Sequence, residues 1–217
     1  MAWTDLLFFI LQDIGTVAFA LSGAMAAIQR ELDVLGIVIL GVITALGGGV
    51  VRDILLGITP PLMFENYHFL AVALVTSLLV YALESLSSKY LDKYRHSYLP
   101  LINLADAVGL GVFTVVGVNT AFLYGYGSNW FLVIFVGTTT GVTGGMLRDV
   151  LAGQVPMVLH KQIYVLASIT GAIIYYLLYQ TNLEATIALY TSVLTIILIR
   201  ILAIYFKWNL PKVPRNR

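Results

Sequence analysis

The sequence predicts an all-α membrane protein with seven transmembrane helices, built as two inverted three-helix repeats followed by a seventh helix. Composition is the first reason, because 59% of the 217 residues are hydrophobic and 11% are charged, whereas soluble domains carry about 25% charged residues. Seven long apolar runs and a duplicated Gly-Arg-Asp motif are the other two reasons. This hydrophobicity excludes a soluble globule and a disordered chain. A β-barrel would show short alternating segments instead.

Each predicted span is a run of about 20 mainly apolar residues, enough to cross the hydrocarbon core as a helix. The seven runs cover residues 5–28, 33–57, 66–86, 103–124, 130–153, 161–180 and 183–206. The first run starts without a basic segment and carries Asp5, which favours a retained helix over a cleaved signal peptide. The second is rich in glycine, and the third ends at the longest connection, the polar and basic residues 87–102.

The last four spans carry features that relate them to the first three or mark the end of the chain. The fourth shares an aspartate with the first, the fifth repeats the glycines of the second, and the seventh precedes a basic tail. No connection is long enough to hold a soluble domain, so the whole chain is predicted to form one transmembrane domain. Its parts are repeat 1 (5–86), repeat 2 (103–180), the seventh helix (183–206) and a cytoplasmic tail (207–217).

Lysine and arginine gather on one side of the membrane when the seven spans are threaded alternately. That side receives Arg30, Lys89, Lys93, Arg95, Lys161, Lys207, Lys212, Arg215 and Arg217. The opposite side offers Asp5, Glu65 and Glu184. Because cytoplasmic loops collect lysine and arginine, we expect the N-terminus outside and the C-terminus in the cytoplasm. An even number of spans would place the basic tail on the wrong side.

An internal repeat of 96 residues relates the second and fifth spans. Residues 44–60 read TALGGGVVRDILLGITP and residues 140–156 read TGVTGGMLRDVLAGQVP, with eight of 17 positions identical. Asp13 and Asp106 form a further pair at a spacing of 93 residues. Since each repeat holds three spans, the second copy enters the membrane from the opposite side. Transporters and some channels use this plan, with the pathway at the repeat interface near the midplane.

The glycine clusters are Gly47, Gly48 and Gly49 in the first copy and Gly144 and Gly145 in the second. Each glycine costs about 1 kcal/mol relative to alanine inside a helix, so the clusters need a reason. One interpretation is close helix packing through small-residue ladders. The other is a break in the helix, which membranes tolerate where the freed backbone lines a cavity or contacts protein. The two interpretations are compatible.

Charged residues inside the spans are the candidate pathway residues: Arg52, Asp53, Arg148, Asp149, Asp13 and Asp106. Neighbouring positions do not face each other on a helix, so each arginine is expected to pair outside its own dipeptide. The candidate pairs across the repeat are Arg52 with Asp149 or Asp106, and Arg148 with Asp53 or Asp13. Salt bridges that only hold the bundle together are the alternative. Two arginines against four aspartates would suit a cation path.

Two threonines, Thr44 and Thr140, lie one turn before the glycines. They could add hydroxyl oxygens to the pathway, although donation to the helix carbonyl four residues earlier is the commoner role. Arg200, two turns from the tail, is expected to extend its charge to the inner surface.

Other kinds of site are not indicated. The three histidines stand apart without ligand spacing, which argues against a metal site. No catalytic constellation or cofactor motif is present, so an enzyme is not expected. The net charge of +1 is too small to attract nucleic acid.

The doubled motif, GGGVVRDILLG at 47–57 and GGMLRDVLAG at 144–153, resembles the bacterial branch of the trimeric intracellular cation (TRIC) channel family. The resemblance implies a homotrimer in the bacterial inner membrane, in contact with membrane lipids and with one pore in each protomer. It also implies that the second and fifth spans kink at their glycines and line a pore for potassium or sodium ions. The fifth span lacks the lysine of the animal members, so their phosphoinositide regulation is not implied here.

Two functions remain open from the residues. The first is a passive cation channel. The second is a carrier for a small zwitterion such as glycine, since arginine suits a carboxylate and aspartate suits an ammonium group, and bacterial relatives also bear the label of glycine transporters. A carrier would use alternating access. A purely structural membrane protein is disfavoured because charges buried in register are costly.

Overall fold

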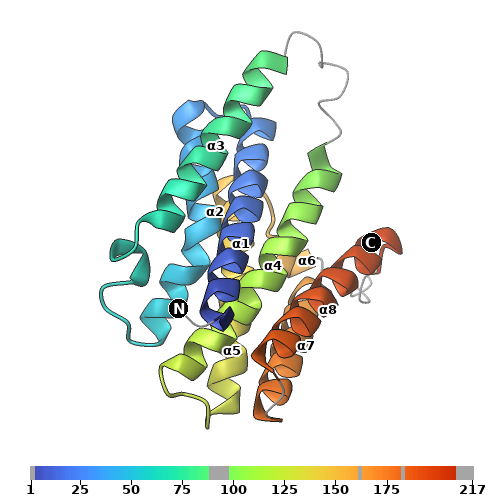
Figure 1. Ribbon diagram of the computed structural model, residues 1–217. Coiled ribbons are helices and arrows are strands. Elements are labelled where there is room, and N and C mark those ends of the chain that lie inside the picture. The colour runs from blue at the N-terminus through green and yellow to red at the C-terminus, as the bar shows by residue number, and fades with distance from the viewer. Residues whose placement is uncertain (1–2, 88–97, 161–162, 182–183, 209–217) are drawn as a thin grey trace.

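The computed structural model describes residues 3–87, 98–160, 163–181 and 184–208 (Figure 1). The long helices are α1 (Trp3–Gln29), α2 (Val34–Leu55), α3 (His68–Ser87), α4 (Tyr98–Leu123), α5 (Trp130–Leu151), α7 (Ile163–Gln180) and α8 (Ala185–Tyr205). Two short segments, η1 (Leu62–Phe64) and α6 (Met157–His160), follow α2 and α5. All seven long helices are apolar and long enough to cross a membrane, which confirms the predicted spans over the described residues.

The helix bounds agree with the predicted ones within about two residues, except at the start of α4. This helix begins at Tyr98 rather than at 103. The Tyr98 hydroxyl donates to the Glu84 carboxylate on α3 at 2.6 Å. Pro100 fits here because the first turn of a helix has no partner for its N–H groups. Seven of the nine basic residues that predict the orientation lie outside the described residues: Lys89, Lys93, Arg95, Lys161, Lys212, Arg215 and Arg217.

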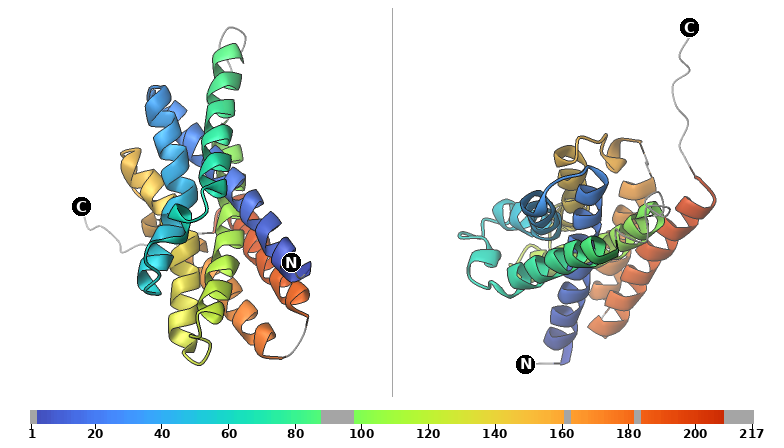
Figure 2. Two further views of the ribbon diagram at one scale, coloured as in Figure 1. Left: turned by 60° about the vertical axis from the view of Figure 1, so that its left-hand side comes forward. Right: turned by 90° about the horizontal axis from the view of Figure 1, so that it is seen from above.

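The two repeats run in opposite directions. In Figure 1, α1 rises from the N-terminus while its equivalent α4 descends, and α2 and α5 are opposed in the same way. The four helices form the centre: α1 packs on α2, α4 packs on α5, and α2 crosses α5. Helix α3 covers α1 and α2, whereas α7 and α8 cover α4 and α5 from the other side (Figure 2). The inverted three-plus-three arrangement with a seventh helix is therefore present.

Equivalent helices also begin alike. The Asp33 side chain caps α2 by accepting the Gly36 N–H at 2.7 Å, and Asn129 caps α5 by accepting the Leu132 N–H at 3.1 Å. Both caps satisfy a backbone donor that the first turn leaves without a partner. The two capping residues are 96 residues apart, the same spacing as the Gly-Arg-Asp motif. The repeat thus extends to the local signals that start each helix.

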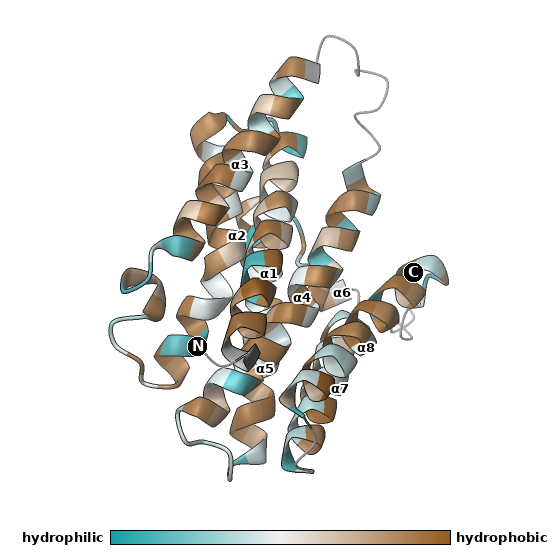
Figure 3. Ribbon diagram, viewed as in Figure 1, coloured by the Kyte–Doolittle hydropathy of each residue, from teal (hydrophilic) through white to brown (hydrophobic). Residues whose placement is uncertain are grey.

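Hydrophobic residues predominate along the long helices (Figure 3). Large aliphatic and aromatic side chains are exposed on every long helix, as expected where the neighbour is lipid rather than water. The most buried span is α4, which lies between α1, α5, α7 and α8. Six charged side chains are buried among the described residues: Arg52, Asp53, Asp106, Arg148, Asp149 and Arg200.

The glycine clusters act as packing surfaces in continuous helices. Helices α2 and α5 run without interruption through their glycines, so the expected break in the helix is wrong. A Cβ atom on Gly48 would fall on the Thr140 carbonyl oxygen, and one on Gly144 would fall on the Thr44 carbonyl oxygen. The small residues therefore let the two backbones touch where α2 crosses α5. A bend of the helix axis at the glycines stays a prediction.

Candidate functional site

The C-termini of α2 and α5 end in the same glycine motif. Gly57 and Gly153 have positive φ angles of 72° and 65°, a conformation that favours glycine. In α2, the Gly57 N–H donates to the Ile54 carbonyl and the Ile58 N–H donates to the Asp53 carbonyl. The equivalent two bonds close α5. Part of the duplicated motif is therefore a helix stop that satisfies the last carbonyl groups.

We expect Gly57→Ala and Gly153→Ala each to destabilise the folded protein by about 1 kcal/mol, because alanine pays the steric cost of positive φ. Gly57→Asn is the control, since asparagine tolerates this conformation better than alanine does. The measurement is the temperature at which detergent-solubilised protein loses its monodisperse peak. Equal melting temperatures for the alanine variants and the parent would contradict the assigned role.

The aspartates of the motif hold the segment that follows each helix. Asp53 Oδ2 accepts the N–H of Leu62, the first residue of η1, at 2.9 Å. Asp149 Oδ2 accepts the N–H of Met157, the first residue of α6, at 2.7 Å. The other oxygen of each carboxylate is left to receive an arginine. Each aspartate thereby ties the helix end to the connection behind it.

Each arginine of the motif contacts its own aspartate neighbour. Arg52 Nη2 lies 2.7 Å from Asp53 Oδ1, and Arg148 Nη2 lies 2.8 Å from Asp149 Oδ1. The expected pairs across the repeats, Arg52 with Asp149 or Asp106 and Arg148 with Asp53 or Asp13, are therefore wrong. The rule that neighbours do not face each other concerns their Cβ directions. A guanidinium lies several bonds beyond its Cβ atom, so it can fold back onto an adjacent carboxylate that a backbone N–H holds in place.

The second repeat contains a buried charge cluster, which we call the second-repeat cluster. Its members are Asp106, Arg148, Asp149, Tyr164 and Arg200. Asp106 is completely buried and lies 2.8 Å from Arg148 Nη1 and 3.4 Å from Arg200 Nη2. The Tyr164 hydroxyl donates to the same carboxylate at 3.3 Å. The cluster joins α4, α5, α7 and α8.

The second-repeat cluster reaches the first repeat through Arg148, whose Nη1 also donates to the Ser22 hydroxyl on α1. Arg148 is therefore surrounded by two carboxylates and a hydroxyl group and is 1% exposed. Such a fully paired arrangement is what burial of an arginine requires. In this conformation Arg148 forms buried salt bridges between helices and lines neither of the two cavities described below. This arrangement agrees with the alternative interpretation, in which the salt bridges hold the bundle together.

The expectation that Arg200 extends its charge to the membrane surface is wrong. Its side chain is 2% exposed, and its guanidinium lies 4.5 Å above the centre of the Tyr164 ring. The carboxylate of Asp106 and the aromatic face attract the cation inward. With Arg200 buried, the positive and negative charges of the core are equal in number, so the expected excess of carboxylates is wrong. The buried charged residues over the described part of the chain are three arginines and three aspartates: Arg52, Arg148, Arg200, Asp53, Asp106 and Asp149.

The first repeat is arranged differently. Asp13, the equivalent of Asp106, lies 2.8 Å from His68 Nε2, and the two side chains are 32% and 41% exposed. Phe9 and Phe69 flank the imidazole ring, with ring centres at 4.9 Å and 5.2 Å. Asp13 therefore pairs with α3, and Arg52 is left with Asp53 as its carboxylate partner.

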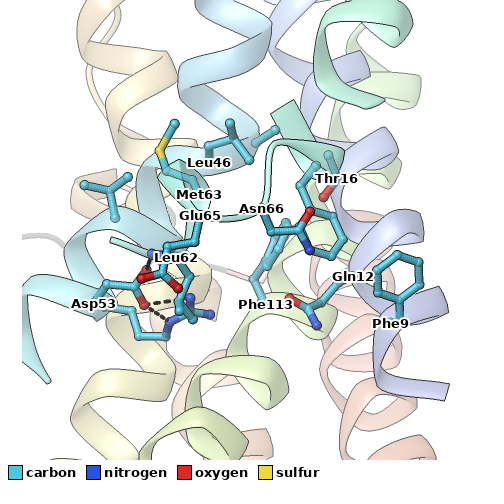
Figure 4. A pocket seen from close by; sticks show the side chains of 15 residues that line it. Phe9, Gln12, Thr16, Leu46, Asp53, Leu62, Met63, Glu65, Asn66 and Phe113 are labelled. Atoms are coloured by element: carbon cyan, nitrogen blue, oxygen red, sulfur yellow. Dashed lines mark hydrogen bonds and ion pairs between the residues drawn. The ribbon is translucent and has the colours of Figure 1, made fainter. Parts of the chain in front are cut away.

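A cavity of about 300 Å³, which we call the first-repeat cavity, opens beside Arg52 and Asp53. Figure 4 shows Asp53 and Leu62 on one side of it and Gln12, Phe9 and Thr16 of α1 on the other. Further wall residues come from α2, η1, the connection to α3, α3 and α4: Ala45, Leu46, Gly49, Val50, Met63, Glu65, Asn66, Phe69 and Phe113. The cavity thus lies among elements of the first repeat, and Phe113 of α4 is its wall residue from the second repeat.

A second cavity of about 480 Å³ adjoins the first. Both cavities have Gln12, Arg52 and Leu62 in their walls, and the second continues between α1 and α4 past Asn119 and Thr120. Arg52 is therefore the cation that faces both cavities. The carboxylates of Asp53 and Glu65 line only the first.

The two threonines of the motif do not contribute to these walls. Thr44 donates to the Leu40 carbonyl and Thr140 donates to the Val136 carbonyl, each at 2.6 Å, and both side chains are fully buried. They carry out the back-bonding that threonine commonly shows in helices. A role for their hydroxyl oxygens in a pathway stays a prediction.

Two residues of the site, His68 and Tyr164, were absent from the sequence prediction although a signal for them exists. They are 96 residues apart, the spacing of the motif, and each contacts the aspartate of its own repeat. Arg200 has no such signal because α8 lies outside the repeat.

The chain is similar over nearly its whole length to bacterial membrane proteins. The sequence profile of the family described as "Glycine transporter" matches residues 9–85 and again residues 103–180, close to the two repeats. The UPF0126 inner membrane protein YadS of Escherichia coli is 38% identical over 95% of this chain and 96% of its own length. The UPF0126 membrane protein YvgT of Bacillus subtilis is 34% identical over 97% and 96%.

Solved structures of the same fold decide the family. A prokaryotic TRIC channel in 0.5 M KCl is 35% identical over 94% of this chain and 99% of its own, with a TM-score of 0.83. The chain belongs to the bacterial TRIC family. A TRIC cation channel that matches over 100% of both chains has 34% identity and a TM-score of 0.81. The TRIC orthologue of Rhodobacter sphaeroides has 28% identity, 93% and 99% coverage and a TM-score of 0.82. The TRIC protein described here is an integral membrane protein of seven spans.

Proposed function

We propose that this TRIC protein is a cation channel whose pathway follows the interface between the two repeats. The observation that carries the proposal is the pair of adjoining cavities. The second cavity lies between α1 and α4, one helix of each repeat, and adjoins the first-repeat cavity, which is lined by Arg52, Asp53 and Glu65. With one arginine against two carboxylates, its wall has a net charge of −1. A cavity with low-dielectric walls and excess negative charge concentrates cations and repels anions. Carboxylates also line the pathways of cation channels.

The finer features of the proposal draw on the relatives. We propose potassium as the main permeant ion, with sodium also passing, and a homotrimer with one pore in each protomer. The Rhodobacter sphaeroides relative is a trimeric intracellular cation channel orthologue, and the Escherichia coli relative is an inner membrane protein. We place the pore along α2 and α5, with the N-terminus outside and the C-terminus in the cytoplasm of a bacterial cell.

Purified protein in a planar bilayer with potassium chloride on both sides should show discrete unitary currents. We expect Glu65→Gln to lower the potassium conductance severalfold at about 0.01 M salt and to have little effect at about 1 M, because the Debye length falls from about 30 Å to about 3 Å. Glu65 is exposed at the cavity, so its charge acts by raising the local cation concentration.

Glu184→Gln is the matched control for this experiment. Glu184 is also exposed, precedes α8 on the same predicted side of the membrane, and lines neither cavity. We expect its conductance to equal that of the parent at both salt concentrations. Equal conductance of the parent and Glu65→Gln at low salt would contradict entry of cations through the first-repeat cavity.

A carrier for a small zwitterion such as glycine is the second candidate. It is favoured by the inequality of the two repeats, since alternating access requires one half open while the other is closed. Arg52 would bind the carboxylate, and Asp53 or Glu65 would bind the ammonium group. Saturable uptake of radiolabelled glycine into proteoliposomes that is lost in Arg52→Gln, together with the absence of unitary currents, would support the carrier and exclude the channel.

A further inference from the structure

The space beside the last glycine of each cluster differs between the repeats. A Cβ atom on Gly49 would have its nearest neighbour, Arg52 Nη2, at 3.8 Å, and Gly49 lies on the wall of the first-repeat cavity. A Cβ atom on the equivalent Gly145 would meet the Tyr164 hydroxyl at 2.6 Å and Asp106 Oδ1 at 3.0 Å. The volume that is open in the first repeat is therefore filled in the second.

Tyr164 and Asp106 fill this space in the second repeat. Their equivalents in the first repeat, His68 and Asp13, do not fill it. Tyr164 is 1% exposed and points to Asp106, whereas its equivalent His68 is partly exposed and points to Asp13 at the edge of the bundle. The space beside the last glycine of the cluster is thus open in the first repeat and filled in the second.

Arg200 is the cluster member that the repeat does not supply, since α8 stands outside it. Its guanidinium lies 4.5 Å above the centre of the Tyr164 ring and 3.4 Å from Asp106 Oδ2. Tyr164 and Asp106 are the two residues that fill the space beside Gly145. Arg200 is also held less firmly than Arg148. Its contact with Asp106 is 3.4 Å long, and its buried Nε atom has no hydrogen-bond partner.

We propose that Arg200 closes the second half of the pathway by holding Tyr164 and Asp106 in the space that the first repeat leaves open. Arg200 is a positioning residue in this scheme, because it acts through the two groups that it contacts. Without its charge, the second-repeat cluster contains Arg148 against Asp106 and Asp149, a net charge of −1 like that of the first-repeat cavity. Loss of Arg200 would therefore open the second half and make it attractive to cations. This inference rests on the proposed pathway between the repeats.

Thiol labelling tests the closure directly, because the chain contains no cysteine. Val142 is the equivalent of Leu46 and belongs to the same buried core cluster as Tyr164 and Ile196, whereas Leu46 lines the first-repeat cavity. A small water-soluble thiol reagent should react rapidly with Leu46→Cys and slowly with Val142→Cys. We expect Arg200→Leu to raise the labelling rate of Val142→Cys about tenfold or more, as loss of a charged hydrogen bond shifts a two-state equilibrium.

The control variants separate opening from other effects. Arg200→Lys keeps the charge and should label at nearly the parent rate. Arg30→Gln removes an exposed positive charge at the same predicted side of the membrane and should change nothing. Val133→Cys, at a fully buried position of another core cluster, should stay unreactive with Arg200→Leu. Faster labelling at both 142 and 133 would reveal general loosening of the fold and would overturn the proposal.

Tyr164→Phe provides an independent variant that keeps the ring under Arg200 and removes only the hydroxyl beside Gly145. The proposal requires faster labelling of Val142→Cys in this variant too. Unchanged labelling in both Arg200→Leu and Tyr164→Phe would overturn it.

Bilayer recordings of the same variants distinguish the two proposals. We expect the ratio of open to closed time to rise about tenfold or more in Arg200→Leu and to stay unchanged in Arg30→Gln. If no variant conducts potassium while labelling of Val142→Cys still increases, the channel function is wrong and the closure by Arg200 stands. If the parent conducts and neither labelling nor open time responds to Arg200→Leu, the closure by Arg200 is wrong.

Discussion

Replacing Asp106 with asparagine is expected to destabilise the folded protein by about 3–5 kcal/mol, the cost of removing one partner from a buried ion pair. Asp106 is fully buried and contacts both Arg148 and Arg200. Its loss leaves two buried guanidinium groups with Asp149 as the remaining carboxylate of the cluster. The measurement is unfolding of purified protein in mixed detergent micelles, with monodispersity after heating as a second readout.

Asp13→Asn is the matched control, because Asp13 occupies the equivalent position in the first repeat. Its side chain is 32% exposed and pairs with a His68 side chain that is 41% exposed. Such exposed pairs contribute about 1 kcal/mol or less. Equal destabilisation by Asp13→Asn and Asp106→Asn would contradict the difference that the structure assigns to the two repeats.

The double variant Asp106→Asn with Arg200→Leu tests charge balance as the cause. It leaves Arg148 paired with Asp149, so the second-repeat cluster is again neutral. We expect the double variant to be more stable than Asp106→Asn alone, as contacting charges show coupling energies of about 0.5–3 kcal/mol. Strict additivity of the two single effects would show that the loss in Asp106→Asn has another origin.

Gly48→Ala is expected to destabilise the protein by about 3 kcal/mol or more, at the upper end of the range for overpacked cores. The new Cβ atom would fall on the backbone carbonyl oxygen of Thr140. No side chain can rotate away to relieve this clash, so α2 and α5 would have to separate. Gly144→Ala meets the Thr44 carbonyl oxygen in the same way. Both variants should reduce the yield and melting temperature of the solubilised protein.

The neighbouring substitution Gly49→Ala is the control. Its Cβ atom would lie 3.8 Å from the nearest atom, Arg52 Nη2, an ordinary contact distance. Alanine is also the better helix former by about 1 kcal/mol, so the variant should equal or exceed the parent in stability. A severe loss in Gly49→Ala, or none in Gly48→Ala, would contradict the packing assigned to the glycine cluster.

The seven spans, their approximate bounds and the inverted repeat could be predicted from the sequence because each depends on local composition or on spacing along the chain. Bilayer thickness sets the length of an apolar helix. The spacing between the two copies of a duplicated motif can be read directly from the sequence. The caps at Asp33 and Asn129 and the helix stops at Gly57 and Gly153 are likewise local. Their 96-residue spacing is visible in the letters alone.

The charge pairs could not be predicted in this way. The duplicated Arg-Asp motif suggests equal halves, yet Arg148 belongs to a closed cluster and Arg52 faces two cavities. The difference arises from groups that the motif does not contain, namely Ser22, Tyr164 and Arg200. Their contribution depends on which helix packs beside which, and on the reach of long side chains between helices.

The sequence by itself therefore determined the class of protein, the number of spans, the inverted repeat and the duplicated Arg-Asp pair within the spans. Only the tertiary structure decided that Arg200 turns inward, that Asp13 pairs with His68, and that the glycines join two backbones rather than break a helix. The physical reason is that hydropathy and backbone signals act over a few neighbouring residues. Partners of a buried charge are instead chosen by helices that meet from distant parts of the chain.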